Sequence, residues 1–266
     1  MSAYYHVPKP NLRHMEIDKY LKLIPELLRQ IAGNRLVVFC EDSFIAELFE
    51  RLGTLNAVDL SIQMVALRDL PAFPAAERLL VSCEAQDLER TGERQYREKG
   101  HAHYWALFKG HDPSIYLQNV AIWLSKLAMV ARAIELCEPE GDQFVCWADA
   151  SLAQFAYIRS GWDFARASLS ISQVNHYASQ MRYKQKTLPL NASYLAATPG
   201  LWSLVIPRFY EILDEHLDDV YAHDEETILG LLVKERPEWF HCIGAPYKGP
   251  FLRQRYWLNR LFRLGA

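Results

Sequence analysis

Asp149 is the residue of this sequence that is best placed to do chemistry. It follows the apolar run 144–147 and the small residue Ala148, and two more small residues, Ala150 and Ser151, come after it. Such a short apolar run is typical of a strand that is buried on both faces inside a parallel sheet. Because parallel sheets bind ligands beyond the carboxyl ends of their strands, we expect Asp149 to face a cleft. Alternatively, Asp149 only caps the helix that follows it, as Asp often does.

Lys126 is the second candidate, and it belongs to the longest periodic segment of the chain. Residues 114–137 repeat their apolar positions at steps of three and four, which predicts a helix with one apolar face. Lys126 lies on the flank of this face. A long cation there can extend its ammonium to water, which is the commoner outcome, or point into a cleft and meet phosphate. Because the helix leads directly into the Asp149 strand, we keep Lys126 as a ligand-binding candidate.

Three consecutive acids, Asp224, Glu225 and Glu226, open another predicted helix. The helix dipole favours acids at this end, so capping alone would explain them. The phase of the following apolar residues places Asp224 and Glu225 on the buried side, where a carboxylate needs a partner or a wet pocket. We therefore expect at least one of Asp224 and Glu225 to cap the helix. We also expect Asp224 to face the substrate, Glu225 to support it or to contact a second substrate, and Glu226 to lie in solvent.

The elements that must position these residues alternate between strand and helix. We expect further strands at 36–40, 58–65 and 194–197, and helices at 16–31, 44–52 and 199–216, with a kink at Pro25 in the first helix. Residues 84–99 predict a solvated helix, the histidines of 100–113 a loop, and 166–183 an irregular segment with some helix. The alternation predicts an α/β fold with a mainly parallel sheet. We find no repeat and no linker, which favours a single domain over residues 1–266.

The composition narrows the class of protein. The chain is 50% hydrophobic, its net charge is −3 and its five cysteines are scattered without a C-x-x-C pair. These features favour a large core in a reducing compartment and do not indicate nucleic acid as a partner. No apolar run is long enough to span a bilayer. We expect a cytoplasmic protein without a transmembrane segment, and a peripheral association with a membrane stays open.

Taken together, several segments give the chain a family likeness. It resembles the HtrL/YibB family of bacterial putative glycosyltransferases over nearly its whole length. The segments that carry the resemblance are 2–5 (SAYY), 36–41 (LVVFCE), 123–126 (WLSK), 147–151 (WADAS), 191–194 (NASY) and 224–227 (DEET). The resemblance implies a GT-A-like, Rossmann-type three-layer domain with a mainly parallel, mixed central sheet. It also implies transfer of a sugar from a nucleotide-sugar donor to a glycan or surface-polysaccharide acceptor, such as lipopolysaccharide.

The resemblance also assigns roles to residues. GT-A enzymes carry an Asp-x-Asp motif that holds the donor and a divalent metal, Mn²⁺ or Mg²⁺, and here Asp149 and Ser151 stand at its two acidic positions. A looser likeness to the His-x-x-Gly-x-x-Lys-Pro motif of related transferases makes His241 the second metal ligand and Lys248 a diphosphate contact. The implied catalytic carboxylates are Asp224 and Glu225. The implied donor-binding residues are Tyr4, Lys126, Asp149, Ser151, Asn191, Gly244 and Lys248.

Two other functions remain open at this point. Because Ser151 replaces the second acid of the motif, the chain is also consistent with a degenerate GT-A-like domain that binds a nucleotide or a glycan without turnover. Another enzyme on an α/β scaffold, such as a metal-dependent hydrolase, ranks last, since no His and Asp residues show metal-ligand spacing.

Overall fold

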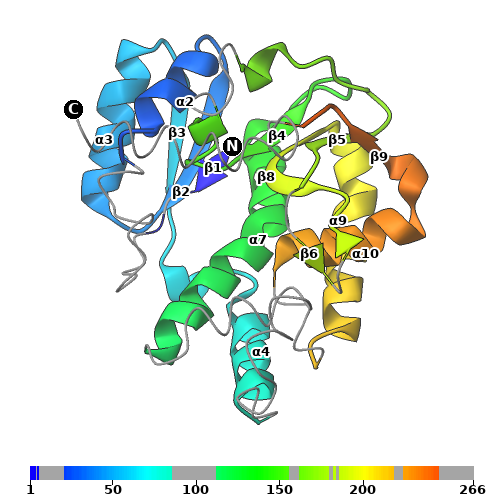
Figure 1. Ribbon diagram of the computed structural model, residues 1–266. Coiled ribbons are helices and arrows are strands. Elements are labelled where there is room, and N and C mark those ends of the chain that lie inside the picture. The colour runs from blue at the N-terminus through cyan, green and yellow to red at the C-terminus, as the bar shows by residue number, and fades with distance from the viewer. Residues whose placement is uncertain are drawn as a thin grey trace, which may run out of the picture.

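The computed structural model describes residues 1–3, 5, 21–85, 112–155, 162–179, 182–183, 186–218 and 224–245. Its strands are β1 (Ser2–Ala3), β2 (Arg35–Cys40), β3 (Asp59–Met64), β4 (Val145–Ala148), β5 (Val174–Tyr177), β6 (Arg182–Tyr183), β7 (Lys186–Thr187), β8 (Asn191–Ala197) and β9 (Phe240–Cys242). Its α-helices are α2 (Ile24–Gln30), α3 (Ser43–Leu55), α4 (Phe73–Ala85), α7 (Pro113–Cys137), α9 (Pro199–Glu215) and α10 (Glu225–Glu235). Short 3-10 helices are η2 (Leu67–Asp69), η4 (Phe164–Arg166) and η5 (Pro237–Trp239) (Figure 1).

The first sheet is parallel and has the strand order β1-β2-β3. Alternate residues of β2 face opposite sides of the sheet. Leu36, Val38 and Cys40 pack with residues of α2 and α3, whereas Val37 and Phe39 belong to the core around α7. Because helices cover both faces, β2 is buried along most of its length, which explains its continuous apolar sequence.

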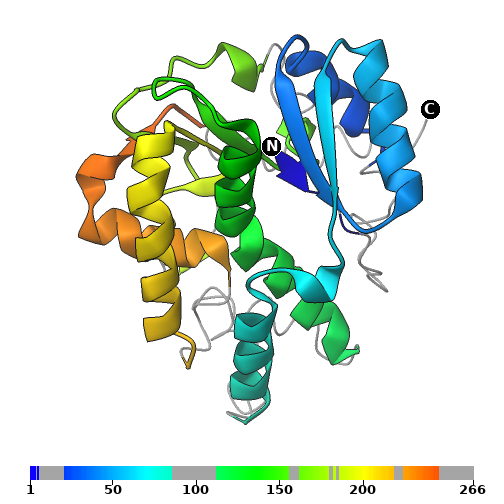
Figure 2. The same ribbon diagram turned by 180° about the vertical axis from the view of Figure 1, so that it is seen from behind.

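The second sheet is mixed and has the order β4-β8-β5-β9. Strand β8 runs antiparallel to both β4 and β5, while β5 and β9 are parallel. Helices α7 and α9 lie side by side on one face of this sheet, as Figure 2 shows, and share a core with α10. The other face carries a cluster of aromatic side chains from Phe155, Trp162, Phe164, Tyr177 and Tyr194.

Met1 connects the two sheets. Its main-chain nitrogen donates a hydrogen bond to the Cys146 carbonyl, and the Ala148 N–H donates to the Met1 carbonyl. These two bonds flank Trp147 as the bonds of a parallel ladder do. Strand β4 therefore lies next to the line of β1, with β2 one strand further away. Asp149 leaves β4 at the edge where the parallel strands of both sheets end.

The α/β class is confirmed, and the strands form one parallel and one mixed sheet. The strands expected at 36–40, 58–65 and 194–197 are present, as are the helices that begin near 44, 114, 199 and 225. Strand β5 and helix α4 were not expected. The expected kink at Pro25 is wrong, because α2 begins at Ile24 and a proline in the first turn loses no helical hydrogen bond.

Most of the expected helix at 84–99 and all but the last residues of the histidine segment at 100–113 lie outside the described residues. None of the helices in the described residues combines the length and the hydropathy of a membrane-spanning segment.

Candidate functional site

Asp149 is held by two neighbours at the carboxyl end of β4. Its Oδ1 atom accepts a hydrogen bond of 2.7 Å from the indole nitrogen of Trp147 and lies 2.8 Å from Lys126 Nζ. Trp147 reaches it because residues two apart on a strand point to the same side of the sheet. In the described residues, no backbone N–H group of the following turn donates to this carboxylate. The capping interpretation is therefore wrong for the Asp149 side chain.

Lys126 lies inside the molecule, where its ammonium meets three acceptors. Besides Asp149, the nitrogen lies 2.5 Å from Glu225 Oε1 and 3.5 Å from the Ala192 carbonyl oxygen. These acceptors match the three N–H groups of an ammonium. The nitrogen also lies 5.5 Å from the centre of the Trp147 ring. Only 5% of the Lys126 side chain is exposed, so the commoner expectation that it extends to water is wrong.

The start of α10 brings its acids to the same place. The Asp224 side chain caps the helix, accepting hydrogen bonds of 2.8 Å from the Thr227 N–H and 2.9 Å from its hydroxyl. The next residue, Glu225, is 7% exposed in its side chain and faces Lys126. The expected substrate-facing role of Asp224 is therefore wrong, because its side chain caps the helix, whereas Glu225 supports the site through its ion pair with Lys126. We call Lys126, Asp149 and Glu225 the Lys126 cluster.

Glu226 is half-buried, which corrects the expectation that it lies in solvent. Its Oε2 accepts a hydrogen bond of 2.9 Å from the Ser179 hydroxyl, just beyond β5, and its Oε1 accepts one of 3.0 Å from the Ala192 N–H in β8. Helix phase alone predicts that the Glu226 side chain points to solvent. The edge of the sheet, however, lies close to the first turn of α10, and its Ser179 hydroxyl and Ala192 N–H donate hydrogen bonds to this carboxylate. Glu226 thus links α10 to the ends of two strands.

Burial and neighbouring charges shift the pKa values of these groups. Burial lowers the pKa of the Lys126 ammonium, but Asp149 and Glu225 more than offset this and leave it above its ordinary value. Burial raises the pKa of Glu225, and Asp224 and Asp149 add to this while Lys126 opposes it. Burial, together with Asp224 and Glu225, raises the pKa of Glu226 to about 8. The site therefore holds a permanent cation and carboxyl groups of different acidity.

The residues do not fit the divalent metal that the family resemblance implies. The carboxylates of Asp149 and Glu225 are already paired with the Lys126 ammonium, which lies where a cation shared by them would sit. His241 belongs to β9, three strands from β4, so about 14 Å of sheet separates the two strands. Among the described residues, no group of three or more His, Cys, Asp or Glu side chains could hold a metal ion.

The other expected donor-binding residues lie at or near the same edge. Asn191 opens β8 and its side-chain oxygen accepts a hydrogen bond from the Ser193 N–H. Ser151 is half-buried in the turn after Asp149. Gly244 follows β9, has a φ of +134° and accepts a hydrogen bond from the Ala178 N–H beyond β5. Tyr4 and Lys248 lie outside the described residues.

Three participants were not identified from the sequence, namely Trp147 as a donor, Ser179 and Glu226. Trp147 carries a signal that could have been used, because a tryptophan two positions before an acid on one strand shares its side of the sheet. Ser179 has no such signal, since the strand before it was not expected.

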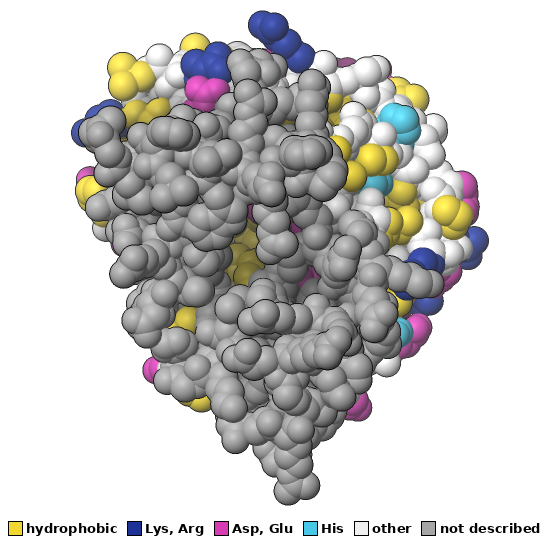
Figure 3. Space-filling model, viewed as in Figure 1, with side chains coloured by type: hydrophobic (Ala, Val, Ile, Leu, Met, Phe, Trp, Pro, Cys, Tyr) yellow, Lys and Arg dark blue, Asp and Glu magenta, His cyan; other side chains and the backbone are white. Residues whose placement is uncertain are grey.

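The cluster is partly open to solvent. Asp149 keeps 23% of its side chain exposed, whereas Lys126 and Glu225 are enclosed. Figure 3 shows hydrophobic and acidic side chains near the middle of this side of the molecule. An exposed carboxylate held from behind by a cation and an indole can accept hydrogen bonds from hydroxyl groups, and can stabilise positive charge that develops on a ligand.

Comparisons of the chain with protein-family models, with curated proteins and with solved structures found no match.

Proposed function

We propose that this protein transfers a sugar from a nucleotide-sugar donor to a glycan acceptor, on a domain of the GT-A-like type. The observation that carries this proposal is the Lys126 cluster, a partly exposed carboxylate fixed at the carboxyl edge of the sheet by a buried lysine and a buried glutamate. Ligands of α/β sheets bind beyond this edge. The strand sequence β3-β2-β1, continued to β4 through Met1, supports the proposal, because doubly wound nucleotide-binding domains use the same order.

In this function Asp149 contacts the reacting sugar. The bond from the anomeric carbon to the diphosphate breaks and a bond to an acceptor oxygen forms, while positive charge develops on the sugar in between. The departing diphosphate takes the proton of the acceptor hydroxyl. A carboxylate that is already oriented stabilises that charge without having to reorganise. Lys126 and Trp147 act on Asp149 as positioning residues, and Glu225 keeps Lys126 in place.

The charge of the leaving diphosphate needs a cation, and Lys126 is already neutralised by its two carboxylates. The family resemblance gives this task to Lys248. Because the carboxylates present do not fit a divalent metal, no step of the proposed reaction passes through one.

A second function, binding of a nucleotide sugar or glycan without turnover, is favoured by one observation. The acid that faces the cluster from α10, Glu225, is enclosed and paired with Lys126, so it is not placed to take a proton from an acceptor. A site with one accessible carboxylate can recognise hydroxyl groups and still lack a base for transfer.

One experiment tests both functions. Purified protein is mixed with a panel of nucleotide sugars, and donor binding and donor hydrolysis are measured for the natural chain, for Asp149→Asn and for Asp59→Asn. Asp59 is an exposed acid at the start of β3, at the other end of the sheet, and serves as the matched control. Turnover that Asp149→Asn abolishes and Asp59→Asn preserves supports the transferase. Binding without turnover supports the second function, and neither binding nor turnover overturns both.

A further inference from the structure

Ser193 lies directly opposite Asp149 in the antiparallel pairing of β4 and β8. The register of the two strands ends with Ala148 opposite Tyr194. The Asp149 N–H continues this register by donating a hydrogen bond of 2.8 Å to the Ser193 carbonyl. Residues directly opposite in an antiparallel pair have their Cβ atoms about 5 Å apart and point to the same face of the sheet. The side chains of Ser193 and Asp149 are therefore neighbours.

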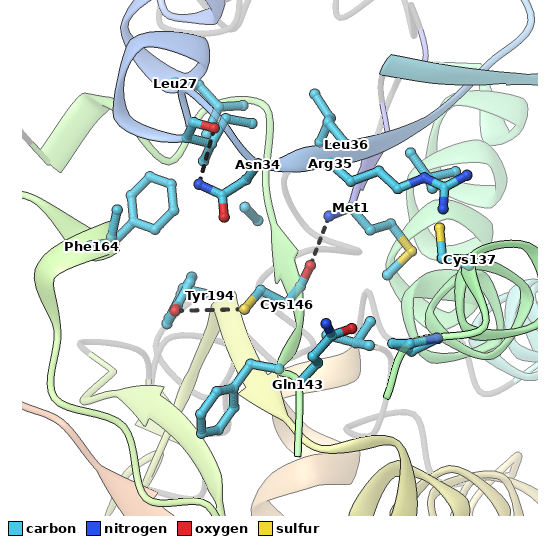
Figure 4. A pocket seen from close by; sticks show the side chains of 18 of the residues that line it. Met1, Leu27, Asn34, Arg35, Leu36, Cys137, Gln143, Cys146, Phe164 and Tyr194 are labelled. Carbon is cyan, nitrogen blue, oxygen red and sulfur yellow. Dashed lines mark hydrogen bonds between the residues drawn. The ribbon is translucent and has the colours of Figure 1, made fainter. Parts of the chain in front are cut away.

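The adjoining residues show which face of the sheet this is. Trp147 and Leu195 lie opposite each other, and both pack in the core that contains α7. Tyr194 points to the other face, where its hydroxyl donates a hydrogen bond to the Cys146 thiol, as Figure 4 shows. Because side chains alternate along a strand, Ser193 points to the same face as Leu195, which is the face that α7 covers.

An irregularity at the start of β8 accompanies this position of Ser193. The pairing of β8 is regular on the side of β4, but on the side of β5 it skips residues 192–194. The Ala192 carbonyl of this bulge accepts a hydrogen bond from the Lys126 ammonium, and the Ala192 N–H donates one to Glu226. Bulges are common next to active sites, where they change the direction of a side chain. The bulge thus ties Ser193 to the Lys126 cluster.

Asp149 and Ser193 each keep a polar atom for a ligand. The contacts of the Asp149 carboxylate with Trp147 and Lys126 both end on Oδ1, and among the described residues no donor reaches its Oδ2. Ser193 is half-buried, and its hydroxyl makes no hydrogen bond to the part of the chain that the structure describes. A carboxylate oxygen accepts hydrogen bonds, whereas a hydroxyl both donates and accepts them. Together the two groups can bind two hydroxyl groups of a ligand.

We propose that Ser193 is a specificity-determining residue of the sugar site. Its hydroxyl binds one hydroxyl group of the sugar, and Asp149 Oδ2 binds another hydroxyl group of the same sugar. One ring can meet both side chains because their Cβ atoms lie only about 5 Å apart. The inference rests on the proposed function, since it concerns the sugar that Asp149 contacts. It implies that the site selects sugars in which two particular hydroxyl groups are free.

The test measures Kd values by calorimetry, so that it does not depend on turnover. The ligands are UDP-glucose, UDP-galactose and GDP-mannose, each with the analogues that lack one hydroxyl group of the sugar. The proteins are the natural full chain, Ser193→Ala and Ser61→Ala. Ser61 is the matched control, because it is also a half-buried serine on a strand and belongs to β3 in the other sheet. Ser193→Ala keeps the main-chain hydrogen bonds of β8 and should fold normally.

In the natural chain we expect the removal of one particular hydroxyl group to weaken binding about three- to tenfold, the contribution of a single hydrogen bond between neutral groups. Ser193→Ala should bind the complete sugar and this analogue equally, whereas Ser61→Ala should still distinguish them. Asp149→Asn should reduce the discrimination at a different hydroxyl group of the same sugar.

The other outcomes separate this inference from the proposed function. If Ser193→Ala weakens the complete sugar and all its analogues by the same factor, or changes none of the Kd values, the inference is overturned while the proposed function stands. If none of these nucleotide sugars binds to the natural chain, the proposed function and the inference fail together.

Discussion

The ammonium nitrogen of Lys126 lies 2.8 Å from Asp149 Oδ1, although the two residues come from the middle of α7 and from the end of β4. The same nitrogen reaches Glu225 at the start of α10. One buried cation thus joins a helix, a strand end and a helix start. Removing Lys126 would leave both carboxylates without their cation, so the site and the stability of the fold depend on the same contacts.

We expect Lys126→Met to lower the free energy of unfolding by about 3–5 kcal/mol, because it leaves Glu225 buried without its cation. Urea unfolding measures this change. Arg132→Met is the matched control on the same helix, since Arg132 pairs with Glu135 at 2.8 Å on the surface and should contribute less than about 1 kcal/mol. Adding Glu225→Gln to Lys126→Met should restore part of the loss. Equal losses for Lys126→Met and Arg132→Met would contradict the prediction.

For Asp149→Asn we expect turnover of the accepted nucleotide sugar to fall about a hundredfold or more, because the charge that faces the sugar is lost. The melting temperature should change by only a few degrees, since Lys126 keeps Glu225 as a partner and Asp149 is partly solvated. Steady-state kinetics and a thermal scan measure the two effects. A variant that unfolds at the assay temperature would show that Asp149 serves the fold alone.

The two acids at the start of α10 should behave differently. Asp224→Asn keeps a side-chain oxygen for the cap and should preserve both stability and turnover, whereas Asp224→Ala should cost about 1 kcal/mol of stability. Glu225→Gln removes the charge that holds Lys126, and we expect turnover to fall about tenfold. The comparison uses variants assayed at matched folded fractions. A larger loss of turnover in Asp224→Asn than in Glu225→Gln would contradict the assignment of Asp224 to the helix cap and of Glu225 to the support of Lys126.

The stability of the protein should decrease as pH rises from about 5 to 8. The pKa of Glu226 in the folded protein is raised to about 8, so between the unfolded value and pH 8 the folded state holds a proton that the unfolded state has lost. Since one pKa unit corresponds to about 1.4 kcal/mol and partial solvation weakens the effect, we expect a loss on the order of 2 kcal/mol.

Urea unfolding at pH 5, 6.5 and 8 measures this loss, and Glu226→Gln should flatten the dependence by keeping the side chain neutral. A matched control is Glu211→Gln, on the exposed face of α9. An unchanged pH dependence in Glu226→Gln would assign the proton to another group.

Local sequence determined the elements that frame the site. The continuous apolar runs of β2 and β4 predict strands, because a strand that is buried on both faces needs apolar residues at every position. The apolar residues of 114–137 recur at steps of three and four and predict α7, because a helix buries only one face. Asp42 and Asp224 predict the starts of α3 and α10, since capping depends on a side chain and the backbone a few residues away. The edge of the sheet that Asp149 occupies follows from the same local reasoning.

Tertiary structure alone decided which groups meet at that edge. Lys126 on the flank of an apolar face normally extends to water, and it turns inward here because two carboxylates and a carbonyl from other elements compensate its burial. Helix phase predicted an exposed Glu226, and donors from the ends of two strands draw it in. His241 was separated from Asp149 by strand order, which spacing along the chain does not encode. Charges and hydrogen bonds act over a few ångströms in space, and the sequence specifies those distances only through the complete fold.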